Sequence, residues 1–168
     1  MKKAIIITGK NVQDHEFIYP FYRLKEAGFD VVVATEDGKE TIGNLGTKIP
    51  VDCTIASVKP EEYVLMVLPG GAKAMEYIRQ NQQVLDMIRD WNETGKPIAS
   101  ICHAAQLLIS AGVVKGRKIS AYYSIKDDVN NAGGIYVDAP VVVDGNIVSS
   151  PHYKYLGDWM RETLKLAS

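Results

Sequence analysis

The stretch Ile98-Ala99-Ser100-Ile101-Cys102-His103-Ala104-Ala105 changes from a strand pattern to a helical pattern with no separator between the two. Residues 98–101 form a short apolar run that is typical of a strand buried on both faces, and residues 103–110 show a helical pattern. A strand that leads directly into a helix is the unit from which α/β folds are built. The junction falls at Cys102.

The same alternation of short apolar runs and helical patterns extends outward over the chain. We expect strands at residues 4–7, 30–34 and 64–68, a hairpin at 141–148, helices at about 14–27, 84–91 and 152–166, and a β-excursion at 38–50. Pro20 predicts either a kink in the first helix or a helix that begins near it. Strands buried on both faces that alternate with helices predict a doubly wound α/β fold, with a mostly parallel sheet sandwiched between helices. With no linker or repeat in the pattern, residues 1–168 are expected to form a single domain.

The composition is that of an average globular protein and excludes some classes of partner. Of the 168 residues, 46% are hydrophobic and 23% are charged. The net charge of −1, with scattered Lys and Arg residues, gives no reason to expect nucleic acid or an anionic membrane as a partner. The first apolar run ends at Gly9 and is too short for a signal peptide or a membrane span, so we expect a soluble, cytoplasmic protein.

The two cysteines, Cys53 and Cys102, are expected to stay unpaired, because a reducing compartment argues against a disulfide. The spacing of Cys and His residues matches no zinc motif. We therefore expect neither a metal nor a cofactor. Nothing around Cys53 suggests activation, and we interpret it as a packing residue.

Cys102 is the main candidate for chemistry because of its position in the turn. Small residues flank it, as a nucleophile elbow requires, since such a turn brings backbone segments close together. Unpaired N–H groups at the start of a helix favour a thiolate, and cysteine pKa values in such settings fall from ~8.5 to between ~3.5 and ~7.5. The alternative interpretation is a buried structural cysteine, and the segment alone leaves both open.

Three neighbouring positions could complete a site at the carboxyl ends of the strands. Gly70 and Gly71 end the strand at 64–68, and a glycine pair there lets backbone N–H groups approach a substrate as in an oxyanion hole. Glu16 follows the first strand and could place a carboxyl group against the thiol. His103 is a candidate base, but consecutive helical residues point about 100° apart, which predicts a poor approach to the Cys102 sulfur.

The other two histidines, His15 and His152, are interpreted as surface or packing residues.

Motifs over nearly the whole chain resemble the PfpI intracellular protease family, within the wider superfamily of parkinsonism-associated deglycases and class I glutamine amidotransferases. The resemblance implies a flavodoxin-like or glutamine amidotransferase-like fold. The matching segments are residues 16–20, 23–28, 67–71 (VLPGG), 96–103 (KPIASICH), 108–118 (LISAGVVKGRK), 125–128, 131–133, 141–146 and 159–162.

The resemblance implies a role for each candidate residue. Cys102 is the nucleophile and His103 its partner, and the N–H groups of Gly71 and His103 form the oxyanion hole. Tyr122 lines the pocket. Glu16 matches the glutamate that contacts the nucleophile in the superfamily.

The resemblance also implies self-association, as a homodimer or a higher ring. The family's acidic residue after the glycine pair corresponds to Glu76, which would reach His103 of a neighbouring subunit. Two departures weaken this match. Gln13 stands where many members have a second glutamate, and the spacing from Gly71 to Glu76 is one residue longer than usual.

These observations predict a cysteine-dependent enzyme in which Cys102 adds to a reactive carbonyl. Glyoxals or glycated side chains would give glyoxalase III or deglycase activity, and peptide bonds would give the peptidase activity for which the family was named. We favour small carbonyls, because an aldehyde is a better electrophile than an amide and no peptide groove is evident. A different class remains open, namely a redox-sensing stress protein or chaperone in which Cys102 is oxidised.

Overall fold

The strand that ends at Cys102 lies inside a seven-stranded sheet of the computed structural model, which describes all 168 residues. Along the sheet the order is β10-β11-β7-β6-β1-β2-β5, and every neighbouring pair is parallel except β10 with β11. The strands are β1 (Lys3–Ile7), β2 (Asp30–Thr35), β5 (Cys53–Thr54), β6 (Leu65–Leu68), β7 (Ile98–Ile101), β10 (Val142–Asp144) and β11 (Ile147–Ser150). This confirms the predicted flavodoxin-like α/β fold with a mostly parallel sheet.

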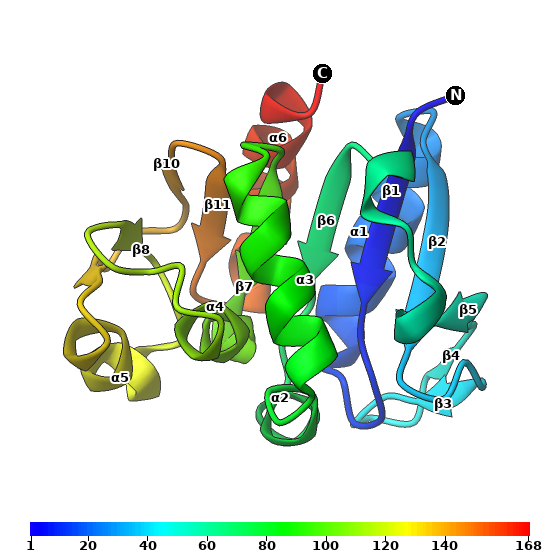
Figure 1. Ribbon diagram of the computed structural model, residues 1–168, viewed down its shortest axis with the longest axis horizontal. Helices are drawn as coiled ribbons and strands as arrows, with labels where there is room; N and C mark the ends of the chain where they lie inside the picture. Colours follow the sequence, from blue (N-terminus) through cyan, green and yellow to red (C-terminus); the bar gives the residue numbers. More distant parts are fainter.

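Six α-helices cover the two faces and one edge of this sheet. Figure 1 shows α3 in front of the strands and α1 and α6 behind them. The helices are α1 (Asp14–Glu26), α2 (Ala72–Ile78), α3 (Gln82–Glu93), α4 (Ala105–Ser110), α5 (Lys126–Asn131) and α6 (Leu156–Leu166). The chain also has five single turns of 3₁₀ helix: η1 (Ile55–Ser57), η2 (Pro60–Glu62), η3 (Cys102–Ala104), η4 (Tyr123–Ile125) and η5 (Tyr153–Tyr155).

The core is divided into two layers by the alternation of side chains along each strand. On β6, Met66 and Leu68 pack in the cluster under α3 and α4, whereas Leu65 and Val67 pack with α1 and α6. Both sets are fully buried. Strands buried on both faces are expected to be continuously apolar, which is why these runs were visible in the sequence.

Most of the expected elements are confirmed, with two differences. The β-excursion contains the antiparallel pair β3 (Thr41–Ile42) and β4 (Lys48–Ile49), and β10 and β11 form the predicted hairpin. Helix α1 runs from Asp14 through Pro20, so the idea that it begins near the proline is wrong. The sequence did not predict α2, α5, the edge strand β5, or the small parallel pair β8 (Lys118–Ile119) and β9 (Ile135–Tyr136).

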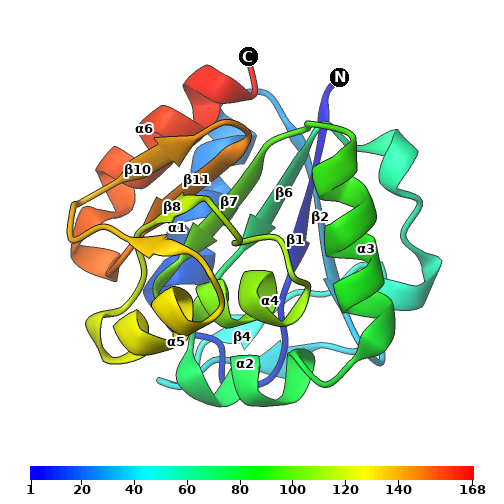
Figure 2. The same ribbon diagram turned by 60° about the vertical axis from the view of Figure 1, so that its left-hand side comes forward.

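The carboxyl ends of β1, β6 and β7 meet at one edge of the sheet. Figures 1 and 2 show the arrowheads of β1 and β6 pointing towards this edge, with α2 lying beyond it. In doubly wound sheets this edge is where ligands bind. None of the helices has the length and hydropathy needed to cross a bilayer.

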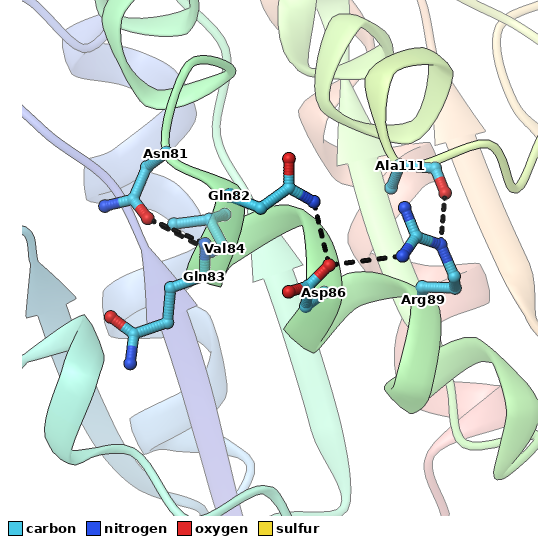
Figure 3. A network of polar contacts seen from close by, with 7 residues as sticks. All are labelled: Asn81, Gln82, Gln83, Val84, Asp86, Arg89 and Ala111. Carbon is cyan, nitrogen blue, oxygen red and sulfur yellow. Dashed lines mark hydrogen bonds and ion pairs between the residues drawn. The ribbon is translucent and has the colours of Figure 1, made fainter.

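Helix α3 is held by a polar network at its first turns, shown in Figure 3. The side-chain oxygen of Asn81 accepts hydrogen bonds from the N–H groups of Gln83, at 3.0 Å, and Val84, at 3.3 Å. Arg89 pairs with Asp86 at 3.1 Å and donates from Nε to the carbonyl of Ala111 at 3.1 Å. The second contact ties α3 to the end of α4, the helix that follows Cys102.

Replacing Asn81 by alanine is expected to lower the free energy of unfolding by about 1 kcal/mol, because two N–H groups lose their cap. Asn81→Asp should retain the stability, since a carboxylate also caps. Gln83→Ala, on the exposed side of the same turn, is the control and should change stability by less than about 0.5 kcal/mol. Urea unfolding measures all three variants, and equal midpoints for Asn81→Ala and Gln83→Ala would show that the cap is not important.

Candidate active site

Cys102 occupies a strained turn between β7 and α4. Its φ is 59°, in the left-handed region of backbone conformation that residues other than glycine and asparagine rarely adopt. The residue is 7% exposed, and its carbonyl accepts a hydrogen bond from the Tyr122 N–H at 3.3 Å. Such strain is held only where the surrounding packing fixes it, and it is common at reactive residues.

His103 contacts the cysteine sulfur directly. The distance from its Nδ1 to the Cys102 Sγ is 3.4 Å. The expectation that these two side chains would point apart was wrong, because Cys102, at the start of the 3₁₀ turn η3, has a positive φ and not the α-helical backbone on which the expectation rested. The His103 ring also lies 4.8 Å, centroid to centroid, from the ring of Tyr122.

Glu16 is fully buried on α1 and faces the same sulfur. Its Oε1 accepts a hydrogen bond from the Gly70 N–H at 2.9 Å, and its Oε2 is buried without a partner. Burial raises the pKa of Glu16 from 4.5 to about 7, although the Gly70 hydrogen bond opposes the shift. A carboxyl group with this pKa is suited to exchanging a proton at neutral pH.

The ionisation of Cys102 differs from the prediction made at the sequence level. Burial, and then the charge of Glu16, raise the pKa of the thiol, and the His103 backbone N–H offsets this only in part. The start of a helix was expected to lower the pKa, but only a 3₁₀ turn and the six-residue α4 follow Cys102. The sulfur is therefore a thiol that can lose its proton to a neighbour during attack. Burial also lowers the pKa of His103, so its ring is neutral at pH 7 and able to accept a proton.

Gly71 presents an unused backbone donor to the site. Its φ is +110°, and its N–H group donates no hydrogen bond within the chain. A Cβ atom there would lie 2.7 Å from the Gln13 nitrogen and 2.9 Å from the Asn11 oxygen, so only glycine fits. Gly70 has another role: its N–H holds the Glu16 carboxyl, and the residue does not line the cavity.

These groups open into a cavity of about 390 Å³. Cys102, Glu16, Gly71, His103 and Tyr122 line one part of it. A hydrogen bond with Tyr123, together with burial, raises the pKa of Tyr122 to about 12, so its hydroxyl stays protonated at neutral pH. A second cavity, of about 420 Å³, lies near Lys10 and Tyr77 and does not include Cys102.

The cavity also includes His152 and Tyr153, which the sequence did not indicate as site residues, and Gln13, which stands where the resemblance expects a glutamate. His152 and Tyr153 are among the lining residues, a placement that the interpretation of His152 as a surface or packing residue did not include. Gln13 lines the cavity and caps α1, with its Oε1 accepting from the Glu16 N–H at 3.1 Å. No composition or spacing signal identifies His152 and Tyr153, because only tertiary packing brings them to the cavity.

Glu76, a predicted site residue, and Cys53, predicted to be a packing residue, both lie away from the cavity within the single chain. Glu76, on α2, has a side chain 64% exposed that pairs with Lys73 at 3.7 Å. A role for it in a neighbouring subunit stays a prediction. Cys53 is half-buried on β5, and both cysteines are free. No group of three or more His, Cys, Asp or Glu side chains is arranged to hold a metal ion.

Comparison with known proteins places the chain in a family. The DJ-1/PfpI family matches residues 2–166. A deglycase of Pyrococcus horikoshii is 48% identical over 164 residues, covering 98% of both chains, and the protein/nucleic acid deglycase 2 of Escherichia coli is 36% identical over 168 residues, covering 98% of this chain and 97% of that protein. The crystal structure of Drosophila melanogaster DJ-1beta superposes with a TM-score of 0.91 at 30% identity, covering 99% of this chain and 90% of that one. The chain therefore belongs to the DJ-1/PfpI family.

Proposed function

We propose that this protein is a cysteine-dependent enzyme that acts on reactive carbonyl compounds, as a glyoxalase III or a deglycase. One observation carries the proposal: the Cys102 sulfur lies in a cavity between a neutral imidazole 3.4 Å away and a buried carboxyl group whose pKa is about 7. Relatives named as deglycases, at 48% and 36% identity, support an enzyme of this kind.

The first step forms a bond between the Cys102 sulfur and the aldehyde carbon of the substrate. The thiol proton moves to the Glu16 carboxylate or to the His103 ring. The electron pair of the carbonyl moves to its oxygen, and the N–H group of Gly71, a cavity-lining residue whose N–H has no partner within the chain, would stabilise that oxygen. The high pKa of the thiol makes a nearby base necessary, and the cavity supplies two.

The later steps depend on what the aldehyde carries. With a free 2-oxoaldehyde, the aldehyde hydrogen moves as a proton to the neighbouring carbon and leaves a thioester of a 2-hydroxy acid. Water then releases the acid and restores the thiol, so the net reaction is addition of one water. With a glycated amine, whose former aldehyde carbon carries a hydroxyl group and the nitrogen, the sulfur bonds to that carbon as the carbon–nitrogen bond breaks, and the amine leaves with the thiol proton. The same proton shift and hydrolysis then follow.

Methylglyoxal and a fluorogenic peptide, offered separately to the wild-type protein, test the proposal. Formation of lactate from methylglyoxal is expected, and turnover of the peptide alone would favour the peptidase activity instead. Absence of turnover with both, together with selective oxidation of Cys102 by peroxide seen in the intact mass, would replace the proposal with a redox-sensing role.

We further propose that the protein self-associates so that Glu76 of one copy reaches His103 of another. Glu76 is exposed on α2, at the edge of the sheet where Cys102 lies. A carboxylate there would orient the imidazole. Light scattering that finds only monomer at assay concentration would remove this part of the proposal without affecting the first.

A further inference from the structure

Aromatic rings from four separate segments form a continuous series beside Cys102. The ring centroids of His103 and Tyr122 are 4.8 Å apart, those of Tyr122 and His152 are 6.2 Å apart, and those of His152 and Tyr153 are 4.1 Å apart. The series ends on α1, where His15 stacks on Tyr153 at 4.9 Å and 20°. All three histidines of the chain take part.

Four of these rings line the cavity: His103, which takes part in the proposed chemistry, and Tyr122, His152 and Tyr153, which are called the aromatic wall from here on. Nothing in the proposed chemistry uses His152 or Tyr153. The wall is also incompletely covered, since Tyr153 is 41% exposed. Rings that line a cavity next to a nucleophile, and that are only partly packed, offer faces on which a flat group can stack.

The rings of the aromatic wall are uncharged at neutral pH, which suits an uncharged planar group. Burial, and then the charge of Lys154, lower the pKa of His152, so its ring is neutral at pH 7. Its Nδ1 accepts a hydrogen bond from the Lys154 N–H at 3.1 Å, which fixes the ring. The cavity of about 390 Å³ is much larger than methylglyoxal needs, so the space beside the wall is available to a second part of a larger substrate.

We propose that the aromatic wall is a subsite for a planar conjugated group attached to the reactive carbonyl, so that aryl carbonyl substrates are selected over alkyl ones. The inference rests on the proposed function for its substrate, because it names the part of the substrate that does not react. Tyr122, His152 and Tyr153 are then residues that determine specificity, while Cys102, Glu16 and His103 carry the chemistry.

The test compares a flat ring with a saturated ring of similar size. Values of kcat/KM are measured for phenylglyoxal and cyclohexylglyoxal in the wild type and in Tyr153→Leu and His152→Leu. For each variant, kcat/KM for phenylglyoxal is divided by kcat/KM for cyclohexylglyoxal. The intrinsic reactivities of the two aldehydes contribute equally to this ratio in every variant, so a change in the ratio between variants reports on the protein. Stacking on one ring is expected to change this ratio by about tenfold. Tyr155→Leu is the matched control, since Tyr155 lies on the same turn, η5, but does not line the cavity.

A second readout does not require turnover. The rate at which Cys102 is alkylated by the N-phenyl amide of iodoacetic acid is compared with that for the N-cyclohexyl amide, by intact mass, in a Cys53→Ala background. A phenyl preference that falls about tenfold in Tyr153→Leu and His152→Leu, and stays in Tyr155→Leu, supports the subsite.

The outcomes separate this inference from the proposed function. If the ratios are the same in all variants for both readouts, the aromatic wall is not a subsite, whatever the enzyme turns over. If neither glyoxal is turned over but the alkylation preference depends on Tyr153 and His152, the subsite stands and the glyoxalase proposal fails.

Discussion

Replacing Cys102 by alanine is expected to reduce the turnover of methylglyoxal by about 10⁴-fold or more, because the sulfur that forms the proposed covalent adduct is lost. The nearby Glu16 and His103 are acids or bases, and neither replaces a sulfur nucleophile. The structural effect of the substitution should be small, since alanine retains the Cβ and the strained φ of 59° persists in the fold. Lactate formation at saturating substrate, together with the thermal midpoint, measures both effects.

Two variants make this result specific to Cys102. Cys53→Ala removes the other thiol, which is half-buried on β5, and should leave kcat/KM within about twofold of the wild type. Cys102→Ser keeps a hydroxyl in place but should be nearly inactive, because the alcohol is a far weaker nucleophile than the thiol. Wild-type activity in a folded Cys102→Ala protein would remove covalent catalysis from the proposal.

The fold was largely predictable because its central strands are buried on both faces. The runs at 64–68 and 98–101 became β6 and β7, each fully buried along its length, and the hairpin at 141–148 became β10 and β11. Helix α2 was missed because its seven residues, Ala72–Ile78, make only about two turns and give too short a pattern to detect. Short elements depend on the tertiary structure more than on their own residues.

The site was predictable as a set of residues but not as a chemical environment. The turn at Cys102 and the glycine pair identify the edge of the sheet, because parallel strands bring their carboxyl ends together. The contact between His103 and Cys102 depends on a backbone angle, and the pKa of each group depends on burial. Neither quantity is a property of the local sequence, which is why the predicted thiolate was wrong.

Replacing Glu16 by glutamine is expected to lower kcat/KM by about 10²- to 10⁴-fold, because an amide cannot accept the thiol proton. The wild-type activity should rise with pH through about 7 as Glu16 ionises, since the carboxylate is the form that acts as base. In the glutamine variant this rise should disappear, and any remaining activity should depend on His103, whose pKa is lowered. An unchanged pH profile in Glu16→Gln would assign the base to His103 alone.

The same substitution should stabilise the protein above neutral pH, and the sign follows from the direction of the pKa shift. Between pH 4.5 and about 7 the unfolded chain releases the Glu16 proton while the folded chain retains it, so wild-type stability falls as pH rises. At about 1.36 kcal/mol per pKa unit, the loss is about 3 kcal/mol by pH 8. Glutamine does not titrate, and its side-chain oxygen can still accept the Gly70 N–H. Urea unfolding at pH 4 and pH 8 should therefore show the difference between variant and wild type moving by about 3 kcal/mol in favour of the variant. A difference that stays constant with pH would mean that folding does not raise the pKa of Glu16, and the rise in activity through about pH 7 could then not be assigned to this carboxyl group.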